Sequence, residues 1–100
     1  MKNYFNKLNK AFENRIRLGI MSMLMVNEQV EFVTFKETLE LTDGNLASHL
    51  SSLEKLGYLA SLKRFIGKKP NTSYSVTKIG ENAFKEHINA LENILKENNL

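Results

Sequence analysis

The chain has 100 residues, of which 42% are hydrophobic and 25% charged, with a formal net charge of +3 and no cysteine. These values are typical of one small globular domain, and they exclude a disulfide framework, a thiolate metal site and a cysteine redox switch. No apolar run approaches the roughly 20 residues of a membrane-spanning helix, and the chain start lacks the apolar stretch of a signal peptide. We therefore expect a single domain over residues 1–100, located in the cytoplasm and without a membrane partner.

The positive charge is concentrated in one quarter of the sequence. The window from Lys55 to Gly80 contains six basic residues and no acidic one, whereas the rest of the chain has more acidic than basic side chains. The six residues are Lys55, Lys63, Arg64, Lys68, Lys69 and Lys78. A local positive field of this kind is expected of a protein that binds a polyanion. Charge alone leaves the alternative of an ordinary solvated loop open.

The first half of the chain is predicted to be mainly helical. Apolar residues spaced mostly three or four apart predict an amphipathic helix over residues 8–26. A short β-prone segment over residues 30–33 follows. A second, short helix is predicted over residues 34–41, because Thr34 and Glu37 have the spacing of a capping box.

A third helix is predicted to run from about Asp43 to Leu56. Thr42 and Asp43 are both suitable N-cap residues, and Gly57 can end the helix in the left-handed region. Four leucines at spacings of four, three and three predict one buried stripe, formed by Leu46, Leu50, Leu53 and Leu56.

The remainder predicts a β-hairpin and a last helix. Strands over residues 58–65 and 72–76 would pair across a long, basic loop at residues 67–71. Thr77 can cap a helix that ends near Glu97. This order of elements predicts a mainly α fold with a small β-hairpin wing, the winged helix-turn-helix.

In such a fold the helix over residues 43–56 would be the recognition helix, and residues 58–77 would form the wing. A helix fits the major groove of double-stranded DNA, where small and hydrogen-bonding side chains can reach bases and phosphates. The expected contacts from this helix and its cap are Thr42, Gly44, Asn45, Ser48, His49, Ser52 and Lys55. The wing would bind the backbone or the minor groove. Its expected contacts are Lys63, Arg64, Lys68, Lys69 and Thr72.

Residues 41–50 (LTDGNLASHL) and 53–58 (LEKLGY) resemble the recognition-helix motif of small winged-helix transcriptional regulators related to the MarR and ArsR groups. Residues 14–18 resemble the first helix of the same family, and residues 70–72 followed by 76–80 resemble its wing and the entry to its last helix. The likeness covers nearly the whole chain. The first-helix motif of the family usually has proline at or near the position of Arg15. The resemblance implies sequence-specific DNA binding, usually as a homodimer and usually in repression.

Apolar residues at both ends of the chain exceed what one small core requires. We interpret them as a homodimer interface, to which the N-terminal segment and the helix over residues 77–97 contribute. The residues are Tyr4, Phe5, Leu8, Ile88, Leu91, Ile94 and Leu95. The alternative is that they close the core of the monomer.

Other functions have less support in the sequence. Phosphate-binding glycine loops and common hydrolase motifs are absent, so we expect no enzyme, no catalytic residue and no cofactor. The two histidines, His49 and His87, lie far apart in sequence and predict no metal site. A small-molecule effector remains compatible with the sequence, because a pocket for such a ligand leaves no simple motif.

The main alternative function is a winged-helix protein-interaction module without DNA, for which a neutral or acidic wing would be expected. RNA binding would require exposed aromatic rings for stacking, and only Phe65 and Tyr74 lie near the basic hairpin.

Overall fold

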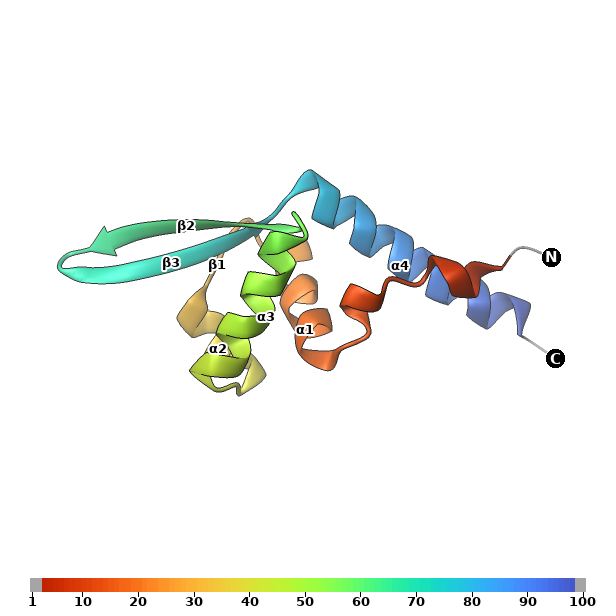
Figure 1. Cartoon of the computed structure of the whole chain (residues 1–100), viewed down its shortest axis with the longest axis horizontal. Coiled ribbons are helices and arrows are strands. Elements are labelled where there is room, and N and C mark those ends of the chain that lie inside the picture. Colours follow the sequence, from red (N-terminus) through yellow and green to blue (C-terminus); the bar gives the residue numbers. More distant parts are fainter. Residues whose placement is uncertain (1–2, 99–100) are drawn as a thin grey trace.

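The structure is a computed structural model that describes residues 3–98. Its helices are α1 (Arg15–Met25), α2 (Phe32–Leu39), α3 (Asp43–Lys55) and α4 (Lys78–Glu97), and its strands are β1 (Val30–Glu31), β2 (Leu59–Ile66) and β3 (Lys69–Val76). Two short 3-10 turns, η1 (Tyr4–Lys7) and η2 (Lys10–Phe12), precede α1. The molecule is elongated, with extents of 58 × 26 × 21 Å. The hairpin β2–β3 projects from one end, and η1 and the C-terminal part of α4 lie at the other (Figure 1). The predicted winged helix-turn-helix is confirmed.

The helix predicted over residues 8–26 is wrong over residues 8–14. The side chain of Asn9 accepts the N–H of Ala11 and caps the turn η2, and the chain then bends before α1 begins. Asn14 has extended backbone angles, and its side chain accepts the N–H groups of both Ile16 and Arg17. This local cap starts a new helix at Arg15, because it satisfies N–H groups that lack a partner in the first turn.

The second helix lies two residues earlier than predicted. It follows β1 directly at Phe32, so Thr34 lies inside the helix and does not cap it. The N-cap is Glu31, whose side chain makes no capping hydrogen bond. The helix ends at Leu39 and is followed by the C-cap residue Glu40, which adopts the left-handed conformation with φ of 53°. The connection to α3 is therefore short, as the helix-turn-helix requires.

The third and fourth helices begin at the predicted caps. Thr42 accepts the N–H of Asn45, and Thr77 accepts the N–H of Gly80. Gly57 follows α3 with φ of +81°, a conformation that glycine adopts without strain. Leu56, which the leucine spacing places in the buried stripe, is 51% exposed, because it lies beyond the last turn of α3.

The core lies between α1, α2, α3 and the base of the sheet. Phe12, in the turn η2, is fully buried. The centroid of its ring lies 5.2 Å from the ring centroid of Phe84 and 5.4 Å from that of Tyr58. The core residues are Phe12, Ile20, Met21, Leu24, Val30, Phe35, Leu46, Leu50, Leu53, Leu59 and Phe84. Burial of these apolar side chains provides the main driving force for folding. The leucine stripe of α3 is thereby fixed inward, which leaves the opposite side of that helix to solvent.

The sheet is antiparallel, with strand order β1–β3–β2. The β2–β3 ladder continues from Leu59 opposite Val76 to Ile66 opposite Lys69. Only two residues, Gly67 and Lys68, connect the strands, so the predicted long loop is wrong. Gly67 has φ of +66° at the first position of the turn, the arrangement of a type II′ hairpin. The short turn lets the pairing extend to the tip and makes the wing a regular ribbon.

Candidate nucleic-acid interface

The outer side of α3 presents small polar and cationic side chains. With 100° between successive residues, Ser48 and Lys55 lie opposite the buried stripe, and Asn45 and Ser52 lie on the flank toward α1. Asn45, Ser48 and Lys55 are exposed, and Ser52 is half-buried. Gly44 is also exposed, and a Cβ added to it would meet no atom of another segment within 4 Å. The structure therefore brings the predicted contact residues of α3 onto one solvent-facing surface.

His49 lies at the edge of this surface and contacts the first helix. Its Nδ1 accepts the Nε–H of Arg17 at 3.0 Å. Burial, and secondarily the positive charge of Arg17, lower the pKa of His49 below its usual value of 6.5. A ring that accepts at Nδ1 carries its proton on Nε2, so it presents one N–H donor. The hydrogen bond fixes both the tautomer and the position of the ring.

The start of α3 carries one acidic side chain, which is paired. Asp43 lies in the first helical turn, and its Oδ1 is 2.9 Å from the Nζ of Lys36 in α2. The cation offsets a negative charge that would otherwise repel phosphate at this end of the helix. At the other end, the Oε2 of Glu54 accepts the hydroxyl of Ser61 at 2.7 Å.

The basic side chains of the wing all reach solvent. Lys63, Arg64, Lys68 and Lys69 are exposed, whereas Thr72 is half-buried opposite Lys63 in the ladder. These four cations lie toward the tip, on the part of the hairpin that extends away from the helices (Figure 1). They can bind the phosphates that flank a DNA groove next to α3.

Hydrogen bonds and close packing hold α3, the wing and α4 in a fixed relation. The N–H of Thr77 donates to the carbonyl oxygen of Tyr58, and its Oγ1 donates to the carbonyl oxygen of Gly57 at 2.6 Å. Gly80 packs against Tyr58 so closely that an added Cβ would lie 2.8 Å from the Tyr58 Cα. The first turn of α4 is thus packed against the segment between α3 and β2.

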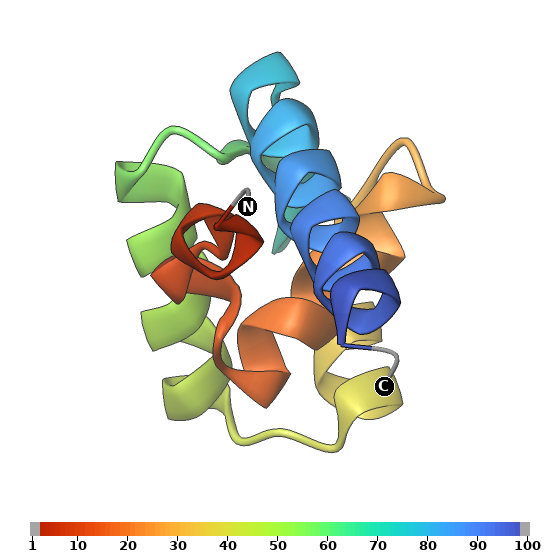
Figure 2. The ribbon, with the colours of Figure 1, turned by 90° about the vertical axis from the view of Figure 1, so that its right-hand side faces the viewer.

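The predicted dimer residues lie together at the end opposite the wing. Figure 2 shows the N-terminal turn η1 beside the C-terminal half of α4. Phe5, Leu91 and Leu95 are 70%, 44% and 68% exposed, whereas Ile88 packs against the core. Tyr4, Leu8 and Ile94 are half-buried.

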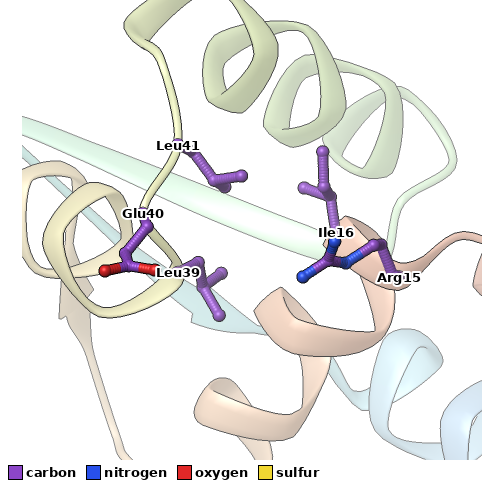
Figure 3. Close-up of a pocket in the computed structure, with 5 residues that line it drawn as sticks. All are labelled: Arg15, Ile16, Leu39, Glu40 and Leu41. Carbon is purple, nitrogen blue, oxygen red and sulfur yellow. The ribbon is translucent and has the colours of Figure 1, made fainter.

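A hollow of about 320 Å³ lies between the first turn of α1 and the α2–α3 connection. Figure 3 shows the side chains around it, with Arg15 and Ile16 from α1 and Leu39, Glu40 and Leu41 from the connection. Its lining combines apolar carbon with one cation and one anion. The hollow lies close to the start of α3.

Sequence reasoning missed polar contacts between distant segments at two places. One is the Arg17–His49 bond across 32 positions. The other is at His87, which is 6% exposed and accepts the backbone N–H of Asn9 at its Nδ1, at 2.9 Å. Asn9 donates in turn from its side chain to the hydroxyl of Tyr58 at 3.0 Å. Contacts of this range leave no periodic pattern in the sequence.

Residues 3–98 include no helix that is long and apolar enough to cross a membrane. Over the same residues, no three His, Asp or Glu side chains are grouped so that they could hold a metal ion.

Comparisons with known proteins agree with this geometry. An uncharacterised protein of Methanocaldococcus jannaschii is 39% identical over 79 residues, which cover 79% of this chain and 86% of that protein. Among solved structures, a transcriptional regulator homologue from Pyrococcus horikoshii superposes with a TM-score of 0.86 at 29% identity and covers both chains fully.

More distant structures share the fold. A putative transcriptional regulator, YtfH, of Salmonella typhimurium has a TM-score of 0.69 at 24% identity, covering 89% of this chain and 78% of that one. NadR in complex with 4-hydroxyphenylacetate has a TM-score of 0.71 at 20% identity, covering 94% of this chain and 66% of that one.

The family model described as "Winged helix DNA-binding domain" matches residues 16–95, which include most of α1, all of α2 and α3, the wing and most of α4. The chain therefore belongs to the winged helix DNA-binding domain family and is a DNA-binding protein of transcription regulation.

Proposed function

We propose that this protein is a sequence-specific repressor that places α3 in the major groove and the wing on the adjacent backbone or minor groove. The observation that carries the proposal is the outer side of α3. Its exposed residues are small, hydrogen-bonding or cationic, and the acidic side chain at its start is paired with Lys36. Short side chains let a helix approach the base edges, and Asn45 and Ser48 can donate to them or accept from them.

The wing supplies affinity that does not depend on sequence. Lys63, Arg64, Lys68 and Lys69 are exposed along the outer part of the hairpin. Each cation that neutralises a phosphate releases counterions, so binding weakens as salt concentration rises. Arg64 is the wing residue that we expect in a narrow minor groove, because its guanidinium is less strongly hydrated than an ammonium group.

A second copy of the chain is the proposed partner at the opposite end. Phe5, Leu91 and Leu95 expose apolar surface where η1 lies against α4. A two-fold dimer through this surface would bury it and direct two copies of α3 to half-sites about one helical turn apart. Repression follows if such a site overlaps a promoter, as is usual in the regulators that the sequence resembles.

A selection from a pool of random duplexes tests sequence specificity directly. The wild-type protein should enrich one inverted repeat, and fluorescence anisotropy should then give the affinity for that duplex. Asn45→Ala and Ser48→Ala should relax preference at individual base pairs, with a loss of about 1–3 kcal/mol for each base that the side chain no longer reaches. A pool that shows no enrichment would contradict sequence-specific binding.

Paired charge variants separate wing contacts from general charge effects. Lys68→Gln with Lys69→Gln should lower the slope of log affinity against log salt by about one for each phosphate that is no longer neutralised. Lys96→Gln, which removes an exposed cation at the far end of α4, serves as the control and should leave the slope unchanged. Equal slopes for all three proteins would remove the wing from the interface.

Sedimentation measurements test the dimer. The wild-type protein should sediment as a dimer, and Leu95→Asp should shift it to the monomer, because a charge cannot be buried unpaired in an apolar interface. Val33→Asp changes an exposed residue of α2 and should leave the dimer intact. A monomeric wild-type protein would contradict the proposal.

The hollow at Arg15 and Glu40 is the site at which we would look for a bound small-molecule effector.

A further inference from the structure

The tip of the wing carries exposed apolar side chains. Phosphate contacts, which account for the cations around the tip, do not account for these apolar residues. Phe65 is 74% exposed and Ile66 is 55% exposed, at the last two positions of β2. Pro70 lies directly opposite Phe65 in the ladder and is also exposed. Exposing apolar side chains to water costs free energy. At this distance from the helices, Phe65 and Ile66 do not pack against the core. The tip is therefore built for contact with something else.

Phe65 and Pro70 form one apolar surface at the tip. Residues opposite each other in an antiparallel ladder point to the same face. Proline has no N–H to donate, so this pair occupies a non-hydrogen-bonded position, where opposing side chains come closest. The type II′ turn at Gly67 and Lys68 follows immediately, which keeps the end of the ribbon narrow. The result is a thin apolar edge on a regular support.

Cations surround this edge. Lys63 lies two positions before Phe65 on the same face, Arg64 and Lys69 lie on the opposite face of the ribbon, and Lys68 lies in the turn, all exposed. An apolar edge meant for a protein core or for a second copy of the chain would be crowded by like charges in that contact. A duplex provides both a hydrophobic target, in its stacked bases, and phosphates on either side for the cations.

We propose that Phe65, with Pro70 behind it, acts as a wedge that enters the minor groove and partly unstacks one base step, so that the wing bends the duplex. The inference rests on the proposed contact of the wing with DNA. Apolar side chains inserted between base steps kink a duplex, and the energy of unstacking is recovered through the added contacts along the bent DNA. Pyrimidine–purine steps such as TA unstack most easily, so the wedge also adds sequence preference outside the reach of α3.

The test measures bending and affinity separately. The probe is a duplex of about 30 base pairs containing the repeat selected by the wild-type protein, with donor and acceptor dyes at its two ends. Wild-type protein should raise the energy transfer. Phe65→Ser should abolish this rise and weaken binding by about tenfold, whereas Phe65→Leu should retain most of both, because leucine is also a wedge residue. Replacing a TA step by GG, at the place on the probe where the wing would bind, should weaken wild-type binding. The same replacement should leave the binding of Phe65→Ser unchanged.

The controls keep the wedge distinct from DNA binding itself. Val26→Ser changes a residue that is 80% exposed and lies outside the wing, and it should behave as the wild type. A Phe65→Ser protein that binds and bends the probe as the wild type does would overturn the wedge and leave the DNA-binding proposal standing. A wild-type protein that binds no duplex would overturn the proposed function first. If Phe65→Ser weakened only the binding of single-stranded probe, or only self-association, base stacking or protein contact would be shown instead, and the wedge would again be overturned.

Discussion

The hydroxyl of Thr77 donates to the carbonyl oxygen of Gly57 at 2.6 Å, which ties the start of α4 to the segment that follows α3. The Oγ1 of Thr77 also accepts the N–H of Gly80 at 3.0 Å and thereby caps α4. One side chain thus fixes the helix that we assign to the dimer relative to the helix that we assign to DNA. In the proposed dimer, this contact would set the angle between the two α3 helices and thus the arrangement of the two DNA half-sites.

Thr77→Val removes both hydrogen bonds while keeping the shape of the side chain. We expect a loss of about 1–2 kcal/mol in the free energy of unfolding, because an N-cap is removed and the Gly57 carbonyl no longer has its donor. Urea denaturation measures this change. Thr38→Val, at an exposed position of α2, is the control and should change stability by less than about 0.5 kcal/mol. Equal effects of the two substitutions would show that the Thr77 hydrogen bonds contribute little.

Two glycines predict opposite effects of the same substitution. Gly80→Ala places a Cβ against the Tyr58 backbone and should destabilise the protein by at least about 2 kcal/mol, since backbone cannot move aside cheaply. Gly44→Ala adds a methyl group in open space within α3 and should stabilise the protein by about 0.5 kcal/mol. Thermal melting of both variants beside the wild type measures the two effects.

DNA affinity adds a second readout for Gly44→Ala. If the start of α3 approaches the duplex closely, the added methyl group should weaken binding even though the fold is more stable. Anisotropy titration beside thermal melting measures both quantities. Tighter or equal DNA binding would indicate that Gly44 does not lie in the contact surface.

Stability at mildly acidic pH should depend on His49. Its pKa in the folded protein lies below the usual 6.5, chiefly through burial and then through Arg17, so the native state favours the neutral ring. Its contribution is therefore complete above the unfolded value and is lost as pH falls toward the folded value. Between about pH 7 and pH 5, His49→Gln should lose less stability than the wild type, because glutamine can accept from Arg17 without titrating. Identical pH profiles in urea denaturation would contradict this.

Ser73 is a predicted site of stabilisation. It is 1% exposed in β3, and within residues 3–98 its hydroxyl has no hydrogen-bond partner. Burying an unpaired hydroxyl is unfavourable, so Ser73→Ala should raise the free energy of unfolding by about 1 kcal/mol. Ser75→Ala, at a half-buried position two residues further along the strand, is the comparison, and urea denaturation measures both. A clear loss for Ser73→Ala would show that this hydroxyl is satisfied.

The N-terminal half shows how far periodicity can be trusted. The helix predicted over residues 8–26 is interrupted because Asn14 caps a new helix, and the apolar spacing continues across that interruption. Thr34 and Glu37 have the spacing of a capping box, yet α2 begins directly after β1, where strand pairing and packing of Phe35 set its position. In both places a tertiary contact or a competing cap outweighs the local pattern.

The candidate interface was easier to predict in α3 than in the wing. Thr42, the inward leucines and the outward polar residues follow from contacts within four positions, so the sequence by itself determined α3 and the start of α4 at Thr77. The tertiary structure alone decided that Arg17 orients His49, that His87 is buried against Asn9, and that Phe65 is exposed at the tip. These outcomes depend on which distant segments pack together and on a two-residue turn that extends the ladder. Long-range packing sets such contacts, and no short-range spacing encodes it.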